Sequence, residues 1–382
     1  MTRRVGICAV AQTPYKGNFW EERFQGMGLM VLESLLEQTG VDFSENGGID
    51  MSISVSNDVF DARTISDNAM TDVLGAHYRC EEKVDQDGSQ AVYYALAAIQ
   101  SGHCDKVLIL GHCKESQCKS RNMVSHLTFD PFYTRPVGLD YLSAAGMQAR
   151  AYGARAGITD VQLARIVARC RAAAAKNPLL PDAVAVTEAE VLASPMLADP
   201  IRELHAYPVS DGAIGMILAA EDVARRISKR PVWITGVGNA MDHFFLGDRD
   251  PGAAEALKAA AKRAYRRAGI TDPGAAFDVV EVCDQYAYQQ PMWMEGLGLV
   301  PAGGGGRWLD AGGPDAARVN LSGGMLAGNP MILGGLTRVA DVVRQLSGIA
   351  GDGQVPDART GLAHGVTGPA GQFHTVITLS RD

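Results

Sequence analysis

The sequence has no long apolar run. None of its apolar segments reaches the roughly 18 residues that a membrane-spanning helix needs. We therefore expect no transmembrane segment and no membrane partner. Two arginines precede a short apolar segment at the N-terminus, and a polar, aromatic stretch soon follows. This pattern predicts a first strand over residues 4–10 and no signal peptide.

Basic residues are also scarce. The chain has 35 Lys and Arg against 43 Asp and Glu, which gives a net charge of −8. Proteins that bind nucleic acid usually carry a basic surface, so this balance argues against nucleic acid as the main partner. The rest of the composition, 47% hydrophobic and 20% charged, is typical of a soluble globular enzyme. A length of 382 residues suggests two or three domains, or one large duplicated unit.

The seven cysteines are too few and too scattered for a disulfide framework. Their odd number suits a reducing compartment, so we expect a cytoplasmic protein. Cys113 and Cys118 lie close in sequence, but no second pair stands at zinc-ligand spacing. We therefore expect no structural metal.

One glycine-rich stretch, Asn320–Pro330, runs directly into a helical pattern with apolar residues at 333, 336, 339, 343 and 346. Gly323, Gly324 and Gly328 would allow positive φ or a close approach of the backbone to a ligand. Pro330 suits a first helical turn. The positive end of that helix would then face something partly negative: a phosphate, a carboxylate or a developing oxyanion.

Two parts of the chain share one order of elements. Predicted strands begin near residues 4 and 50 in the first part and near 231 and 277 in the second, 46 residues apart each time. Each part then has a glycine loop that opens a helix (Gly88, then Gly323) and ends on apolar strands (107–110 and 214–220, then 359–364 and 373–379). This pattern predicts a duplicated α/β fold.

Residues 117–208 depart from this order and are predicted as an inserted loop region with helices over 144–156 and 161–176. The predicted domains are therefore 1–116 with 209–228, the insertion 117–208, and 229–382. Two sheets that sandwich the two loop-bearing helices would bury both helices. That burial would explain their small residues, which are Ala95, Ala97, Ala98, Gly334 and Gly335.

Four segments, in order, resemble motifs of the thiolase superfamily, in particular the sterol-carrier-protein-X type thiolases and their bacterial relatives. Asn320-x-x-Gly-Gly-x-x-x-Gly-Asn-Pro resembles the family's Asn-x-x-Gly-Gly-x-x-x-Gly-His-Pro. The others are Tyr-Pro-Val-Ser-Asp-Gly-Ala at 207–213, Glu-Val-Cys-Asp at 281–284 and the Gly-rich segment 361–371. The resemblance implies a five-layered α-β-α-β-α fold and a homodimer. It also implies chemistry at the carbon–carbon bond next to a coenzyme A thioester, with acyl-CoA as substrate and no bound cofactor.

The same motifs lack the residues on which thiolase chemistry depends. Gly88, followed by Ser89, stands where the family has its acylated cysteine at a helix N-terminus. Asn329 replaces the histidine of Gly-His-Pro, and Cys283 replaces that of Glu-x-His-Asp. No cysteine follows position 283. An obvious nucleophile is therefore missing.

Four residues are candidates for catalysis. Asn320 and Asn329 could donate hydrogen bonds to an enolate oxygen, or they could serve turn and cap chemistry. Cys283 could act as base or nucleophile if its pKa is lowered, or it could be inert packing. His364, at a strand end, has the pKa range suited to acid–base work; the alternative is a histidine satisfied by backbone.

The remaining candidates would bind or support a substrate. Gly88, Ser89, Gly323 and Gly324 would line an oxyanion or substrate site, although Ser89 is better explained as a helix cap. Asp284 is interpreted as a structural hydrogen-bond acceptor. Tyr286 could offer a phenol to a substrate oxygen, but aromatic packing explains it as well.

Three functions remain open. Retro-aldol cleavage of a β-hydroxyacyl-CoA, in a β-oxidation-type degradation of a lipid, steroid or aromatic compound, needs no covalent intermediate and is favoured. Acyl transfer or thiolysis of a 3-ketoacyl-CoA would need a displaced nucleophile. A non-catalytic acyl-CoA-binding subunit is the third. The resemblance also implies a small zinc-ribbon/OB-fold partner as a separate chain. The sequence does not identify the acyl group.

Overall fold

The computed structural model describes residues 3–45, 47–59 and 65–382. The first part of the chain forms β1 (Val5–Gln12), α1 (Phe24–Thr39), β2 (Met51–Val55), β3 (Cys80–Val84), α2 (Ser89–Gln100) and β4 (Lys106–Lys114). After the insertion come β7 (Asp211–Ala220) and α7 (Glu221–Ile227). The second part comprises β8 (Val232–Met241), α8 (Glu255–Ala268), β9 (Val279–Glu281), α9 (Gln289–Gly296), α10 (Gly305–Asp310), α11 (Gly313–Ala316), α12 (Gly334–Ser347), β10 (Thr360–Thr367) and β11 (Phe373–Ser380).

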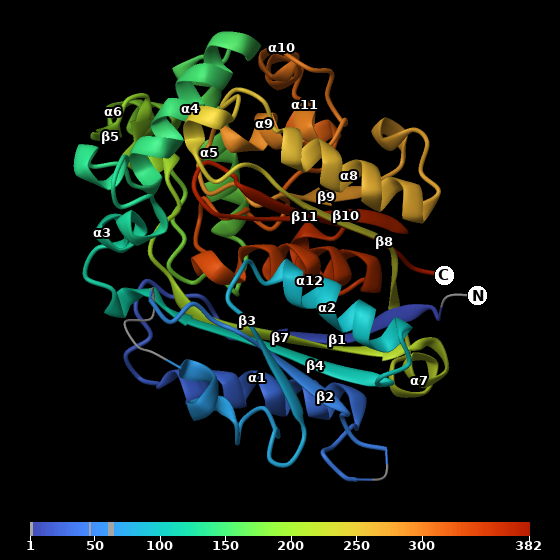
Figure 1. Ribbon diagram of the computed structural model, residues 1–382. Helices are drawn as coiled ribbons and strands as arrows, with labels where there is room; N and C mark the ends of the chain where they lie inside the picture. Colours follow the sequence, from blue (N-terminus) through green and yellow to red (C-terminus); the bar gives the residue numbers. More distant parts are fainter. Residues whose placement is uncertain (1–2, 46, 60–64) are drawn as a thin grey trace.

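These elements stack in five layers (Figure 1). α1 covers the outer face of the layer β3-β2-β4-β7-β1, and α8 covers the outer face of β8-β11-β10-β9. α2 and α12 lie between the two layers. Strand order is mirrored about the centre, with β1, β7, β4 and β2 matched by β8, β11, β10 and β9. The predicted duplicated, five-layered α/β fold is confirmed.

Helix α8 shows how sequence produces this layering. Its buried residues recur at helical spacing and form one apolar face: Ala256, Leu257, Ala260, Ala261 and Ala264. That face contacts β8, where a Cβ on Gly238 would lie only 2.0 Å from the Ala260 carbonyl oxygen. Small residues on both surfaces therefore allow the helix backbone to rest directly on the strand.

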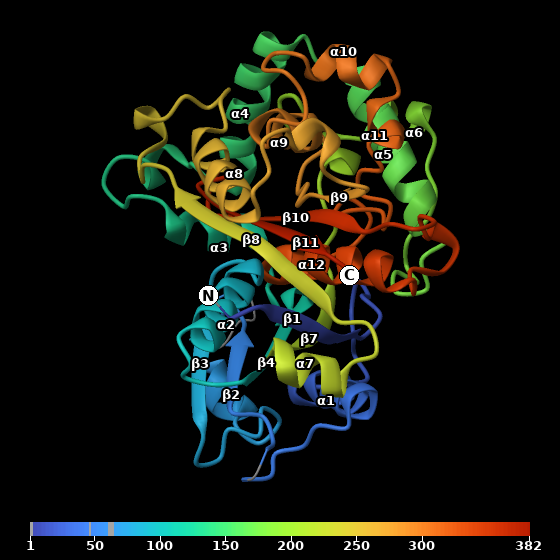
Figure 2. The same cartoon turned by 90° about the vertical axis from the view of Figure 1, so that its right-hand side faces the viewer.

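The two layers belong to one sheet, which differs from the prediction of two separate sheets. Within the described residues, β1 pairs with β8 through Gly6↔Trp233 and Ile7↔Val232. A continuous nine-stranded sheet results, and β8 runs obliquely from one layer to the other (Figure 2). A two-residue pairing between strands far apart in sequence leaves no periodic signal that could have predicted it.

The two middle helices are buried to different extents. Residues of α12 are buried on almost every side. In α2, however, Ala97 is exposed, Ala98 is half-buried and Tyr94 is 51% exposed. The prediction that Ala97 is small because it is buried is therefore wrong: α2 turns one face to solvent.

The insertion forms α3 (Arg121–Ser125), α4 (Tyr141–Ala156), α5 (Asp160–Ala174), α6 (Glu188–Ala193) and a short hairpin of β5 (Met196–Ala198) and β6 (Ile201–Arg202). It lies along one side of the layered core (Figure 1), and its predicted helices are confirmed as α4 and α5. The three-part domain division stays a prediction. In the part of the chain that the structure describes, no helix combines the length and apolarity needed to cross a bilayer.

The contact between α2 and α12 explains why position 88 is glycine. Gly88 has an ordinary helical φ of −59°, so its backbone does not require glycine. A Cβ at this position, however, would lie 2.6 Å from Leu336 Cβ. The space in which the family's cysteine side chain would lie is therefore filled by α12.

We expect Gly88→Ala to lower the free energy of unfolding by about 1–3 kcal/mol, because the added methyl overpacks this contact. Gly88→Cys carries the same Cβ and should be destabilised at least as much. Urea unfolding would measure both changes. Gly247→Ala is the matched control, since a Cβ there meets nothing within 4 Å. Equal effects at 88 and 247 would contradict the packing argument.

Candidate active site

The helix entry that the glycine-rich stretch was expected to form is built differently. Pro330 precedes a single 3-10 turn, Met331–Leu333, and α12 begins only at Gly334. The first helical N–H groups do face an anion, but it is the chain's own Asp87. Its Oδ2 accepts a hydrogen bond from Gly335 N at 2.7 Å.

Asp87 also binds the start of α2. Its Oδ1 accepts from the Ser89 backbone N–H at 2.9 Å and from the Ser89 hydroxyl at 2.5 Å. Ser89 therefore donates hydrogen bonds to Asp87, whose carboxylate caps α2, and is not itself the cap. The Asp87 side chain is buried, and this burial raises its pKa to about 6 despite the hydrogen bonds, which act in the opposite direction.

The loop itself holds a second internal carboxylate. Met325 N donates to Asp284 Oδ1 at 2.8 Å, and Gln290 Nε2 donates to Asp284 Oδ2 at 3.0 Å. Asp284 is fully buried, and burial raises its pKa to about 6. The interpretation of Asp284 as a structural acceptor is supported by these bonds.

The glycines of the loop pack against protein and not against a ligand-sized space. Gly323 and Gly324 have φ values of 104° and 64°, which favour glycine. A Cβ on Gly323 would lie 2.6 Å from Ala174 Cβ, and one on Gly324 would lie 2.6 Å from Asp284 Oδ1. Backbone conformation and close packing therefore explain these glycines, and their role in binding a ligand stays a prediction.

Asn320 continues the edge of β9. Its Oδ1 accepts from Val282 N at 2.7 Å, its Nδ2 donates to Val282 O at 3.0 Å, and its own N–H donates to Val280 O at 2.9 Å. The side-chain amide thus imitates a backbone peptide, with Asn320 at a positive φ of 49°. These bonds support a structural role for Asn320 in a turn, because both polar atoms of its side-chain amide are already hydrogen-bonded to the backbone.

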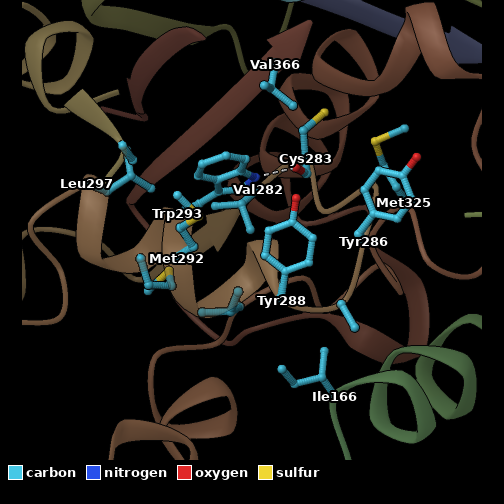
Figure 3. Packing of buried hydrophobic residues seen from close by; sticks show 14 of the residues in the cluster. Ile166, Val282, Cys283, Tyr286, Tyr288, Met292, Trp293, Leu297, Met325 and Val366 are labelled. Atoms are coloured by element: carbon cyan, nitrogen blue, oxygen red, sulfur yellow. Dashed lines mark hydrogen bonds between the residues drawn. The ribbon is translucent and has the colours of Figure 1, made fainter. Parts of the chain in front are cut away.

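Cys283 lies two residues after β9 and is fully buried beside Trp293 of α9 (Figure 3). Its carbonyl accepts from Trp293 Nε1 at 2.9 Å, and a Cβ on Gly334 would lie 2.7 Å from its sulfur. Burial, with a smaller contribution from the Asp87 charge, raises the pKa of the Cys283 thiol well above its usual value. The condition for a reactive thiolate, a lowered pKa, is not met.

Asn329 is buried beside an arginine that sequence reasoning missed. Its Nδ2 donates to Pro330 O at 2.7 Å, and its Oδ1 accepts from Arg338 Nη2 at 3.3 Å. Arg338, also buried, donates to Glu281 Oε2 at 3.1 Å and to Ser322 Oγ at 3.0 Å. Burial raises the pKa of Glu281 to about 7. Arg338 and Asp341 stand three residues apart in the predicted helix and form an ion pair, and this spacing was the available signal.

His364 lies in the middle of β10 and not, as the sequence predicted, at a strand end; it is fully buried and points away from α12. Its neighbour Gly365 faces Asp87 and Ser89, so His364 faces the opposite side of the strand, toward Trp293. His364 Nε2 lies 2.9 Å from His374 Nδ1, while its Nδ1 has no hydrogen-bond partner among the described residues. Burial, and then His374, lowers the His364 pKa well below its usual value.

Tyr286 is packed among aromatic rings. It stacks on Tyr288 at a centroid distance of 6.2 Å and meets the edge of Tyr207 at 6.1 Å, and Figure 3 shows Tyr286 and Tyr288 below Cys283. Burial raises the Tyr286 pKa. Packing therefore explains this residue, as expected.

The structure brings most predicted site residues together around the start of α12. These are Gly88, Ser89, Cys283, Asp284, Asn320, Gly323, Gly324 and Asn329. His364 is not among them, because it lies on the opposite face of β10, beside Trp293 and His374. In the described part of the chain, no group of three or more His, Cys, Asp or Glu residues is placed to hold a metal ion.

Two small pockets border this region, each with a volume of about 10 Å³, close to the space of one water molecule. The first is lined by residues that include Trp293, Gly371 and His374. The second is lined by residues that include Gly328 and Arg338. An acyl group would have to displace side chains to enter either of them.

The raised pKa of Asp87 predicts how the free energy of unfolding depends on pH. Its pKa rises from 3.8 to about 6 on folding, so the folded state binds this proton more tightly than the unfolded state. The resulting stabilisation is complete below about pH 4 and is lost as pH rises through 6. Asp87→Asn should therefore become less destabilising, relative to the parent chain, between pH 4 and 7.

Urea unfolding at several pH values tests this. The exposed Asp352, changed to Asn, controls for the loss of a carboxyl group. Stability curves of the Asp87→Asn variant and the parent chain that run parallel from pH 4 to 7 would contradict the prediction.

Comparison with known proteins identifies relatives of this chain. The family described as "Thiolase C-terminal domain-like" matches residues 238–381. An acetyl-CoA acetyltransferase from Methanothermobacter thermautotrophicus is 30% identical over 379 residues, which cover 97% of each chain. Sterol carrier protein 2 from Oryctolagus cuniculus is 31% identical over 202 residues, which cover 50% of this chain and 36% of that protein.

Among solved structures, the "Ltp2-ChsH2(DUF35) aldolase" superposes with a TM-score of 0.82 at 18% identity. The match covers 100% of this chain and 98% of that one, and it shows a shared fold. The nearly full-length similarity to the archaeal acetyltransferase, together with the matched family, shows that the chain belongs to the thiolase superfamily, and the partial match to sterol carrier protein 2 agrees with the resemblance noted from the motifs.

Proposed function

We propose that this chain cleaves the bond between Cα and Cβ of a β-hydroxyacyl-CoA by a retro-aldol reaction, with His364 as the base. The observation that carries the proposal is the unpartnered Nδ1 of His364. A buried nitrogen without a partner costs about 1–3 kcal/mol. A substrate hydroxyl would satisfy it and would supply the proton that this reaction removes.

The covalent alternative has less support. Thiolysis needs a thiolate, yet α12 fills the space beside Gly88 and the Cys283 pKa is raised. A retro-aldol reaction requires a base and a site for the enolate, but no enzyme nucleophile. The name of the archaeal relative favours acyl transfer, whereas that of the structural neighbour favours the aldolase chemistry.

The proposed reaction proceeds in two proton transfers. His364 Nδ1 takes the β-hydroxyl proton, the hydroxyl oxygen becomes the carbonyl of the leaving aldehyde or ketone, and the Cα–Cβ electron pair forms the thioester enolate. Protonated His364 then returns a proton to Cα, which gives the shortened acyl-CoA. Asn329 would stabilise the enolate oxygen, since no second acceptor for its Nδ2 occurs among the described residues.

No further cofactor enters this scheme, and acyl-CoA is the substrate. The neighbour's name joins two components, Ltp2 and ChsH2(DUF35). By analogy we propose that this chain acts as a homodimer in a heterocomplex, with a small zinc-ribbon/OB-fold protein that completes the coenzyme A site.

A second candidate, a non-catalytic acyl-CoA-binding subunit, is favoured by the small pockets and by the carboxylates that occupy the helix entry. It predicts binding without turnover.

The assay is incubation of the purified chain, alone and with its co-purifying partner, with β-hydroxyacyl-CoA esters of different side chains and no free coenzyme A. We expect a free aldehyde or ketone and a shortened acyl-CoA. His364→Gln should lower kcat on the order of 10²-fold, since it removes the base. Cleavage that requires free coenzyme A would support thiolysis instead, and binding without products would support the non-catalytic subunit.

Asn329→Ala should lower kcat on the order of 10²-fold with little change in KM, because its amide is proposed to act on the enolate more than on the bound substrate. Steady-state kinetics on the cleaved ester measures both constants. A rise in KM with unchanged kcat would assign Asn329 to ground-state binding and would contradict the proposed role.

A further inference from the structure

A second buried histidine, His374, lies against the proposed base. The two residues stand on neighbouring antiparallel strands, where His364 pairs with Val376 and His374 pairs with Val366. Their ring planes are 22° apart and their centroids 5.2 Å apart, and Trp293 meets both rings edge-on at 5.8 Å and 4.9 Å. The 2.9 Å contact between their nitrogens is thus held by sheet register and by one aromatic side chain.

Burial lowers the His364 pKa well below its usual value and the His374 pKa to about 3, so both imidazoles are neutral. Each ring then carries one N–H hydrogen, and one of these hydrogens lies between the two nitrogens in contact. Two tautomer arrangements are therefore possible. Either His364 Nε2 donates to His374 Nδ1, or His374 Nδ1 donates to His364 Nε2.

The surroundings of His364 distinguish the two. In the second arrangement the hydrogen of His364 would lie on Nδ1, which would then be a buried donor with no acceptor among the described residues. The first arrangement avoids this orphaned donor, and it places the His374 proton on Nε2, on the side of Gly371. His374 Nδ1 is then an acceptor, His364 Nε2 is the donor, and His364 Nδ1 carries a lone pair.

We propose that His374 is a positioning residue that holds His364 in the tautomer with an unprotonated Nδ1. This inference rests on the proposed retro-aldol function, in which that lone pair accepts the substrate proton. The opposite tautomer would place a hydrogen on Nδ1 and leave the base unable to act. By accepting the hydrogen bond from His364 Nε2, His374 keeps the proton of His364 off Nδ1.

The pocket beside Trp293 gives His374 a further property. His374 and Gly371 line this pocket, whereas His364 does not. Removal of the His374 side chain would therefore leave a space that opens into the pocket. The combined space should admit a small heterocycle. Added imidazole should enter the His374→Ala variant and replace the missing ring.

The first experiment measures the tautomers directly. Two-bond nitrogen–proton NMR correlations on chain labelled with ¹⁵N-histidine should show His364 protonated on Nε2 alone, assigned by loss of its signals in the His364→Gln variant. In His374→Ala that tautomer should no longer be the only one. A His364 that carries its proton on Nδ1 in the parent chain overturns the proposal. This readout does not depend on aldolase activity, so it decides the positioning claim even if no substrate is cleaved.

The second experiment uses turnover of the cleaved ester. His374→Ala should lower kcat on the order of 10²-fold with KM little changed. His374→Asn keeps an acceptor near the former Nδ1 and should retain most of the activity, and added imidazole should restore part of the activity of His374→Ala. His205→Ala removes another buried imidazole, which accepts a hydrogen bond from Arg202 N and does not line this pocket, and it controls for loss of packing.

Equal losses in His374→Ala and His374→Asn, with no effect of imidazole, would overturn the positioning role. Full activity in His374→Ala would overturn it as well. Absence of cleavage by the parent chain, with the expected tautomer present, would instead reject the proposed function and leave the structural assignment intact.

Discussion

The burial of two carboxylates against backbone N–H groups organises the centre of this protein. Asp87 joins the starts of α2 and α12, and Asp284 holds the loop that leads into α12. Each satisfies donors that would otherwise be buried without partners. Both pKa values are raised to about 6, so ionisation of both groups lowers the free energy of unfolding. The chain thus places its own carboxylates at the starts of α2 and α12 and in the loop that leads into α12.

This electrostatic arrangement also limits the chemistry. A thiolate at Cys283 would be a third negative charge beside Asp87 in a water-excluded site, and its pKa is raised accordingly. The buried positive charge of Arg338 is already bound by Glu281 and Asp341. A neutral base suits such surroundings better than an anionic nucleophile. His364, on the opposite face of β10, is such a base and lies outside the carboxylate cluster.

Most of the architecture could be predicted because it follows from local patterns. Apolar strands, amphipathic helices such as α8 and the repeated spacing of elements all leave periodic signals along the chain. The polar edge strand β3 and the exposure of Ala97 left none. The pairing of β1 with β8 likewise involves only two residue pairs. Each of these features depends on what lies beside the element in space, which sequence spacing does not encode.

For the site, sequence alone determined the superfamily motifs, the loss of the usual nucleophile and the candidate residues around positions 283, 329 and 364. It also indicated that Asn320–Pro330 and the following helix would meet an anion. Only the tertiary structure decided that this anion is internal, because Asp87 reaches Gly335 across 248 positions of sequence. It likewise decided that His364 is bonded to His374, whose position on a neighbouring strand is set by sheet register. Hydrogen bonds between distant segments depend on the packed fold, and a linear pattern carries no record of them.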